Sequence, residues 1–229
     1  FAAGWQDMAR HAETAETRAE ATAIAEFLVP LVKGFCTEMG VEVASMGVQV
    51  HGGMGFIEET GAAQHYRDAR ILPIYEGTTA IQANDLVGRK TLRDKGATAR
   101  RLADMIKQTE QDLALGSEQA KSVGAKLAAA REDFLSAVAY LTGVGKQDPN
   151  AAFGAGVPYL MLAGNLVAGW QLGRSLLAAE AALQRADDPE FMTAKIATAR
   201  FYASHILNET SQQRDRIIDG ADSLADAVL

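Results

Sequence analysis

The sequence predicts an all-α protein, on three observations. Apolar residues recur three or four positions apart through most of the 229-residue chain, which is the period of an amphipathic helix. No run of useful length alternates apolar and polar residues as a half-buried strand does. Glycine and proline gather in residues 52–78, so the breaks in the helical pattern are concentrated in one segment.

The first half of the chain carries two helical stripes. One continuous apolar stripe consists of Trp5, Met8, Ala12, Ala15, Ala19, Ala23 and Phe27. Pro30 is expected to open the next helix, because its missing N–H costs nothing in a first turn. That helix is expected to bury Leu31, Phe35, Met39, Val43, Met46 and Val50 and to end at Gly52-Gly53. Helix resumes near Thr79.

The second half is rich in alanine and predicts further helices. A stripe is formed by Ala120, Val123, Leu127, Ala130, Phe134, Val138 and Leu141. A long apolar helix is expected from about Pro158 to Asp187, and Asp188-Pro189 is expected to cap and start another. The end of the chain, with Ile217, Ala221, Leu224 and Val228, is either a short helix or a frayed tail.

A charged, glycine-containing stretch at Asp94-Lys95-Gly96 suggests a domain boundary. We therefore expect an up-and-down helical bundle over residues 1–95 and an additional helical domain over residues 96–229. The chain opens with Phe1 inside an amphipathic pattern, and we interpret it as part of a longer protein.

Composition excludes several classes of function. A formal net charge of −7 argues against nucleic acid or an anionic membrane as a partner, since both require basic patches. The single cysteine, Cys36, excludes an internal disulfide and a cysteine-built zinc site, and it favours a reducing compartment, so a cytoplasmic location is expected. Residues 150–173 carry no charge, but Pro158 and Asn165 interrupt them, and we expect a buried core helix rather than a transmembrane span.

The segment before residue 82 contains the most suggestive chemistry. Thr79-Ala80-Ile81-Gln82 fits a capping box, with the threonine as cap and the glutamine reaching back. Glu76 precedes this helix start, and two interpretations remain open from the residues alone. It is either an exposed loop acid, or a carboxylate partly buried by Ile71, Leu72, Ile74 and Tyr75, whose pKa is thereby raised toward that of a useful base.

Other titratable residues have simpler interpretations. Asp68 with Arg67 or Arg70 is expected to form a structural ion pair rather than a catalytic group. The histidines His11, His65 and His205 lack the spacing of metal ligands, so no metal site is predicted.

The run GVQVHGGMGFIEETGAAQHYRDARILPIYEGTTAIQ, over residues 47–82, resembles the C-terminal helical domain of the acyl-CoA dehydrogenase family. The shared elements are a Gln-x-x-Gly-Gly-x-Gly turn, an Arg-Asp-x-Arg run, then Glu-Gly-Thr and Ile-Gln, in this order. The resemblance extends from Pro30 to Leu86.

The resemblance implies a role for each matching residue. Glu76 matches the base that removes the α-proton of an acyl-CoA thioester, and an acidic residue here places the protein outside the branch whose base sits elsewhere. The Glu76 backbone N–H would bond the thioester carbonyl, and Gly77 would lie against the substrate. Two groups of residues match contacts to FAD. The first group typically contacts the cofactor of the neighbouring subunit, and it consists of Gln49, Val50, His51, Gly52 and Gly53. The second group consists of Thr78, Thr79 and Ala80.

The resemblance also shows what this chain lacks. The family's N-terminal helical domain and middle β-domain are absent, so we expect the chain alone to be inactive. Residues 97–229 resemble the extra helical domain of the longer acyl-CoA dehydrogenases, the group that includes the methylthiopropanoyl-CoA dehydrogenases. Implied partners are an acyl-CoA substrate, electron-transfer flavoprotein as electron acceptor, and further copies of the chain in a dimer or tetramer.

Three competing hypotheses assign a different class of function to the chain. A non-catalytic helical interaction or oligomerisation module could keep this fold, although the intact Glu76-Gly77-Thr78 run argues against it. An α/β-hydrolase, suggested by His51-Gly52-Gly53, fails because no Gly-x-Ser-x-Gly elbow and no strand pattern occur. A phosphate-binding loop at residues 52–55 fails because no strand precedes it and no Gly-Lys-Thr/Ser follows.

Overall fold

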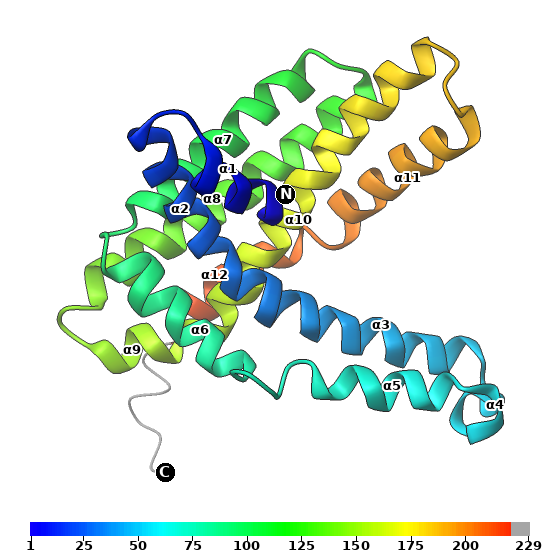
Figure 1. The fold of residues 1–229 in the computed structure, drawn as a ribbon, viewed down its shortest axis with the longest axis horizontal. Helices are drawn as coiled ribbons and strands as arrows, with labels where there is room; N and C mark the ends of the chain where they lie inside the picture. The colour runs from blue at the N-terminus through cyan, green and yellow to red at the C-terminus, as the bar shows by residue number, and fades with distance from the viewer. Residues whose placement is uncertain (221–229) are drawn as a thin grey trace.

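A computed structural model describes residues 1–220, and within that range the chain is helical without any strand, as predicted (Figure 1). Its elements in chain order are α1 (Ala2–His11), α2 (Ala15–Pro30), η1 (Leu31–Phe35), α3 (Cys36–Val50), α4 (Gly53–Phe56), η2 (Glu58–Thr60), α5 (Ala62–Ile71), α6 (Thr79–Val87), η3 (Gly88–Leu92), α7 (Ala97–Ala114), α8 (Glu118–Val144), α9 (Pro149–Gly154), α10 (Gly156–Gln184), α11 (Pro189–His205) and α12 (Glu209–Ile218). The predicted tail residues Ala221, Leu224 and Val228 lie outside the described range.

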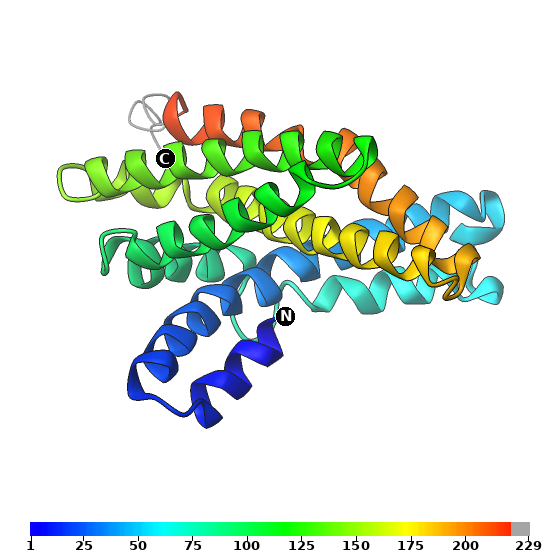
Figure 2. The ribbon, with the colours of Figure 1, turned by 90° about the horizontal axis from the view of Figure 1, so that it is seen from above.

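The stripe from Trp5 to Phe27 is divided between two helices, which corrects the prediction of one continuous stripe. The chain turns at Ala12, whose extended backbone (φ −62°, ψ 147°) ends α1. Thr14 then caps α2 by accepting a hydrogen bond from the Thr17 N–H at 3.1 Å. The two helices fold back on each other as a hairpin (Figure 2). A cap-forming Thr14 inside the apolar pattern is the local signal for this break.

Pro30 does not open a helix, as the sequence predicted, but is the last residue of α2. The chain continues from α2 through the π-helical turn η1 into α3, so one long rod runs from Ala15 to Val50. Within η1 the Cys36 N–H donates to the Leu31 carbonyl, five residues back. Pro30 has no N–H to donate to the Glu26 carbonyl four residues earlier, yet the helix continues past it into the wider turn.

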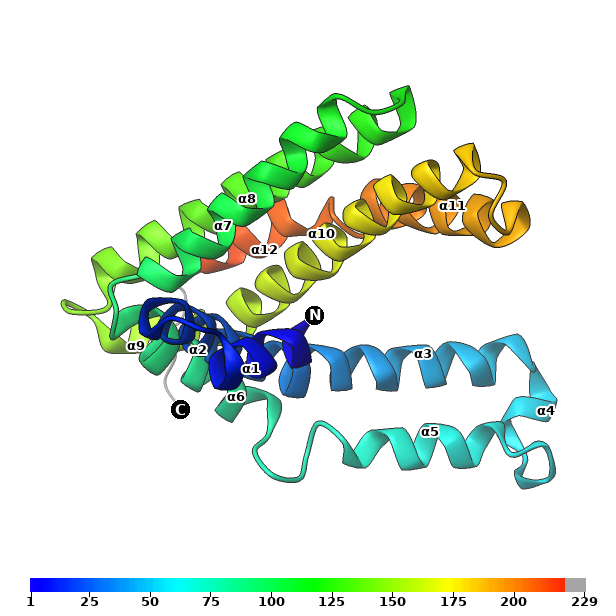
Figure 3. The ribbon, with the colours of Figure 1, turned by 45° about the horizontal axis from the view of Figure 1, so that its top comes forward.

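α3 and α5 form an arm that projects away from the rest of the molecule, with α4 at its tip (Figures 1 and 3). Leu31 and Phe35 are buried at the base of this arm as predicted. Burial of Val43, Met46 and Val50 was predicted wrongly, since these side chains are 66%, 54% and 86% exposed. Their apolar stripe has a helical period, but no element of the described chain covers it.

The core is continuous across the predicted boundary at Asp94–Gly96. Phe27 of α2 packs edge-on against Phe134 of α8, with ring centroids 6.4 Å apart, and Phe134 stacks on Tyr159 of α10 at 5.8 Å. The whole predicted stripe of α8, from Ala120 to Leu141, is buried in this core. Two buried hydrogen bonds complete it, one between the hydroxyls of Thr91 and Tyr159 at 3.0 Å and one donated by the Trp170 indole to Thr109 at 2.7 Å.

Helix α10 corresponds to the long apolar helix that the sequence predicted. Its buried residues extend from Gly156 to Ala182, and Gly164 lies against Phe35 so closely that an added Cβ would come within 2.2 Å of that ring. Asp188 caps α11 as predicted, by accepting from the Phe191 N–H at 3.3 Å. Among residues 1–220, no helix combines the length and the apolar character that crossing a membrane requires.

Candidate active site

The tip of the arm holds the first group of predicted cofactor contacts. Gln49 and Val50 are the last residues of α3, and His51 closes the helix by donating from Nδ1 to the Gly47 carbonyl at 2.9 Å. Gly52 takes a φ of +60°, which favours glycine, and the chain then turns into α4. A Cβ added at Gly52 or Gly53 would meet no atom within 4 Å, so the backbone of this turn is open to a ligand.

The loop of residues 72–78, which we name the Glu76 loop, returns from the arm to the bundle. Its start is held by Lys33 of η1, whose Nζ donates to the Leu72 carbonyl at 2.6 Å. Pro73 is buried, and its carbonyl accepts from the Thr79 N–H at 3.2 Å, so the two ends of the loop are tied together. The Lys33 ammonium also lies 5.4 Å from the centroid of the Tyr75 ring.

Glu76 is an exposed residue at the apex of this loop. Its apolar neighbours are themselves open to solvent, with Ile71 52%, Leu72 36%, Ile74 46% and Tyr75 48% exposed, so of the two interpretations left open by the sequence this chain shows the exposed loop acid. Glu76 has a φ of +50°, in the left-handed region that costs a residue with a side chain about 1 kcal/mol or more. Gly77 follows at +100°, and a Cβ there would lie 2.7 Å from the Gln82 amide nitrogen.

The N-terminus of α6 carries the second group of predicted cofactor contacts. The cap is Thr78, whose hydroxyl accepts from the Ile81 N–H at 3.4 Å, so the predicted cap at Thr79 is wrong by one residue. The Thr79 hydroxyl instead donates to the Glu38 carboxylate of α3. Ala80 follows in the first turn of the helix and is exposed.

Sequence reasoning missed both Lys33 and Glu38. Both are polar residues of the helical segment that follows Pro30, and the apolar pattern identifies only the buried face of that segment. Their partners, Leu72 and Thr79, are 39 and 41 positions away in the chain. No local signal in the sequence connects positions so far apart.

The two groups of predicted contacts lie at opposite ends of the arm (Figure 3). Thr79 is joined to Glu38 near the base of α3, whereas His51 follows the last turn of the same helix. At 1.5 Å per residue, the thirteen positions from 38 to 51 span roughly 20 Å.

The Arg-Asp-Ala-Arg run lies on α5, along the outside of the arm. Arg67 binds the Glu58 carboxylate through two parallel hydrogen bonds of 2.9 and 2.6 Å, and it holds the pKa of that carboxyl below its usual value. The predicted ion pair of Asp68 with Arg67 or Arg70 is therefore not formed among the described residues, because η2 presents Glu58 to the Arg67 guanidinium in a bidentate geometry and no ion pair joins Asp68 to Arg70. This exposed ion pair between Arg67 and Glu58 joins α5 to η2 near the tip of the arm, and we assign it a structural role rather than a catalytic one.

Two family models match the chain and together cover most of it. The model described as "Acyl-CoA dehydrogenase, C-terminal domain" matches residues 2–91. The model described as "Acetyl-CoA dehydrogenase C-terminal like" matches residues 102–227, more than half of the chain. The chain belongs to the acyl-CoA dehydrogenase family. Its match is to the C-terminal parts of these dehydrogenases.

Two curated acyl-CoA dehydrogenases are similar to nearly the whole chain. A 3-methylmercaptopropionyl-CoA dehydrogenase of Ruegeria pomeroyi is 61% identical over 226 residues, which are 99% of this chain and 38% of the relative. The broad-specificity linear acyl-CoA dehydrogenase FadE5 of Mycobacterium tuberculosis is 35% identical over 206 residues, which are 86% of this chain and 34% of the relative. The chain thus spans little more than a third of the length of these dehydrogenases.

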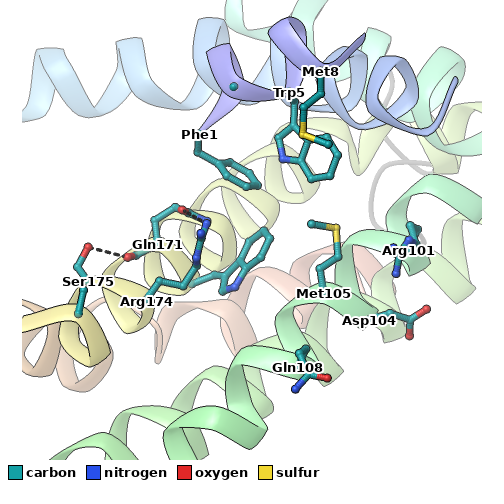
Figure 4. Close-up of a pocket in the computed structure, with 13 residues that line it drawn as sticks. Phe1, Trp5, Met8, Arg101, Asp104, Met105, Gln108, Gln171, Arg174 and Ser175 are labelled. Carbon is teal, nitrogen blue, oxygen red and sulfur yellow. Dashed lines mark hydrogen bonds between the residues drawn. The ribbon is translucent and has the colours of Figure 1, made fainter. Parts of the chain in front are cut away.

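One cavity of this chain is lined by residues outside the predicted site. It has a volume of about 1020 Å³ and is lined by residues of α1, α7 and α10 (Figure 4). Trp5 and Trp170 line it, and the Arg174 guanidinium lies 5.8 Å from the Trp170 ring centroid. A smaller cavity of about 520 Å³ includes Thr79 and Glu38, with Val157 and Met161 of α10 on its other side.

Groups that could hold a metal are absent from the described residues, in which no three His, Cys, Asp or Glu side chains converge.

Proposed function

We propose that this chain is the C-terminal part of an FAD-dependent acyl-CoA dehydrogenase that introduces an α,β-double bond into an acyl-CoA thioester, with Glu76 as the base. One observation carries the proposal. Glu76, an exposed residue, has a backbone φ of +50° and lies just before the N-terminus of α6. Its loop is hydrogen-bonded to Lys33 at its start, and its two ends are hydrogen-bonded to each other. Left-handed backbone at a residue with a side chain is typical of functional sites.

The residues present fit part of an FAD site. Gln49 to Gly53 offer an open turn with the glycine conformation that lets a cofactor approach the backbone. Thr78, Thr79 and Ala80 form the first turn of α6, where backbone N–H groups and the helix dipole favour the negative charge of a pyrophosphate. In the family, the isoalloxazine ring is held chiefly by a domain that this chain lacks, so the chain supplies only one edge of the site.

The reaction divides between the cofactor and the residues of the Glu76 loop. FAD, when bound, would supply the acceptor for the hydride that leaves the β-carbon of the thioester. Glu76 takes the proton from the α-carbon, so that the C–H electron pair forms the new double bond. The backbone N–H of Glu76 bonds the thioester carbonyl and steadies its growing negative charge. Gly77, without a side chain, leaves room for the substrate against the backbone.

A second copy of the protein is part of the proposed site. The exposed stripe of Val43, Met46 and Val50 requires a cover in the assembled protein, because contiguous apolar surface of this kind marks an interface. The tip of the arm also lies roughly 20 Å from the cofactor contacts at α6, estimated from the helical rise. We infer a homodimer or tetramer in which the tip contacts the FAD of the neighbouring subunit, with electron-transfer flavoprotein as the electron acceptor.

The test is anaerobic bleaching of the flavin in the full-length parent protein, wild type beside Glu76→Gln. The panel of thioesters begins with 3-methylmercaptopropionyl-CoA, the substrate in the name of the relative that is 61% identical. Bleaching in the wild type, with retained FAD but no bleaching in Glu76→Gln, supports the base. Equal bleaching in both proteins overturns it.

The chain by itself is proposed to be inactive. Adding FAD and the best thioester to the isolated chain should therefore give no bleaching and no product. If the full-length parent also binds FAD but bleaches with no thioester, the non-catalytic interaction module becomes the better interpretation.

A further inference from the structure

The side chain of Lys33 links the long rod to the Glu76 loop. We propose that Lys33 is a positioning residue for the dehydrogenation, which fixes the direction of the Glu76 carboxylate without touching the substrate. The inference rests on the proposed function, because it assumes that Glu76 is the base.

The π-helical turn η1 places Lys33 where it can do this. The turn follows Pro30 directly and is closed by the bond from the Cys36 N–H to the Leu31 carbonyl. A π-turn contains one residue more than an α-turn, and such turns occur often at functional sites. In this chain the rod leaves its regular helical register at the level of the Glu76 loop, and Lys33 is the central residue of the turn.

The Lys33 side chain makes two contacts, both to residues of the Glu76 loop. Its ammonium donates to the Leu72 carbonyl at 2.6 Å and lies 5.4 Å from the centroid of the Tyr75 ring. Tyr75 is the residue that precedes Glu76 in the chain. Since Ile74, Tyr75 and Glu76 are all exposed, the loop has little packing of its own to hold its shape. The lysine supplies two of the contacts that define it.

The same π-turn supports the other end of the loop through Gly34. A Cβ at Gly34 would lie 3.2 Å from the Cβ of Gln82 and 2.7 Å from a methyl group of Leu160, so the turn packs closely on α6 and α10. The Gln82 amide in turn lies against Gly77, the residue after Glu76. Tyr75 is therefore contacted by a residue of η1, and Gly77 is contacted by a residue that packs on η1.

The C-terminal unit holds this turn in place. Phe35, the last residue of η1, fits against Gly164 of α10 with no space for a methyl group. Leu160, one turn earlier on the same helix, contacts Gly34. Helix α10 of the C-terminal unit thus packs on η1, and η1 in turn contacts the Glu76 loop.

A role in positioning predicts an effect on rate rather than on binding. Lys33 reaches the backbone carbonyl and ring of the loop, whereas the substrate contacts are proposed for Glu76 and Gly77. Displacement of a base by about 1 Å can reduce a rate by as much as 10²-fold while the substrate still binds. We therefore expect the rate of flavin reduction to fall and the KM for the thioester to change little.

The experiment uses the full-length, flavin-loaded parent protein in three variants. Lys33→Met removes the charge and the donor at similar length and should reduce the rate of flavin bleaching about tenfold, with KM within about twofold. Lys33→Arg keeps a cation that can donate to a carbonyl and stack on a ring, and should recover most of the rate. Lys90→Met is the matched control, because Lys90 also lies on a π-turn but pairs with Glu26.

A second measurement separates this inference from the proposed function. Amide hydrogen exchange in residues 74–77 should become faster in Lys33→Met and stay unchanged in Lys90→Met. If the wild type bleaches and Lys33→Met matches it in both rate and exchange, the role of Lys33 is overturned while the function stands. If exchange quickens but neither wild type nor variant bleaches, the proposed function fails and the structural contact remains.

Discussion

The Thr79 hydroxyl donates a hydrogen bond to the Glu38 carboxylate, which joins the start of α6 to the base of the arm across 41 positions of sequence. Both residues are partly buried where the two helices meet. A carboxylate that accepts this bond holds the first turn of α6 against α3. The bond therefore fixes the end of the Glu76 loop to the same rod that holds its beginning through Lys33.

Thr79→Val should destabilise the chain by about 1–2 kcal/mol, because the Glu38 carboxylate loses a donor while it stays partly buried. Urea unfolding of the chain measures the change. Thr22→Val is the matched control, since its hydroxyl bonds only to a carbonyl of its own helix. Equal losses in the two variants would show that the bond between helices has no special weight.

High pH should destabilise the fold through Tyr159. Burial raises the pKa of this tyrosine well above its usual value of 10.0, against the opposing hydrogen bond from Thr91. The folded state then keeps a proton that the unfolded state loses, so stability is full below pH 10 and falls as the pH rises above it. The slope approaches about 1.4 kcal/mol per pH unit for one such group.

Urea unfolding at pH 8 and above pH 10 measures this dependence. Tyr159→Phe should flatten it in part, because burial also raises the pKa of Tyr202. At pH 8 the variant should lose about 1–2 kcal/mol, since the buried Thr91 hydroxyl is left without its partner. Adding Thr91→Val should recover part of that loss. An unchanged alkaline slope in Tyr159→Phe would refute the assignment.

Gly164→Ala should cost about 2 kcal/mol or more, because the new methyl group would lie 2.2 Å from the ring of Phe35. Thermal unfolding of the chain measures it. Gly47→Ala is the control on another helix, where an added Cβ meets nothing within 4 Å, and it should be neutral or stabilising. Adding Phe35→Leu to Gly164→Ala should relieve part of the strain, and no relief would place the clash elsewhere.

Residues 1–95 alone should not fold cooperatively, even though we keep the proposed domain boundary at Asp94–Gly96. Phe27 packs on Phe134 and Leu86 is fully buried in a core to which α8 and α10 contribute. Without those helices, these side chains would be exposed to water. Circular dichroism and urea unfolding of the two separate pieces test this. A sharp transition in the first piece alone would show two independent cores.

The presence of the helices was predictable from the sequence, because the apolar residues that recur with helical period in α8 and α10 are the ones buried in the bundle. The same reasoning was wrong for Val43 to Val50, since a period shows which face is apolar but not whether the chain itself covers it. The position of Glu76 before α6 was also predictable. Its exposure was one of the two interpretations that the sequence left open. The contacts of Lys33 with Leu72 and of Glu38 with Thr79 were not predictable, because they depend on how distant helices meet.

The π-turn after Pro30 gives this protein a tolerance to a change of length at one point. A π-turn contains one residue more than an α-turn, so the deletion of a single residue from Leu31–Phe35 would convert the turn into regular helix and leave the arm facing nearly the same direction. The deletion of a residue from α3 would instead rotate the tip glycines about the helix axis by about 100° relative to the bundle. Chains that share this architecture should consequently differ in length by one residue within the turn more readily than within α3.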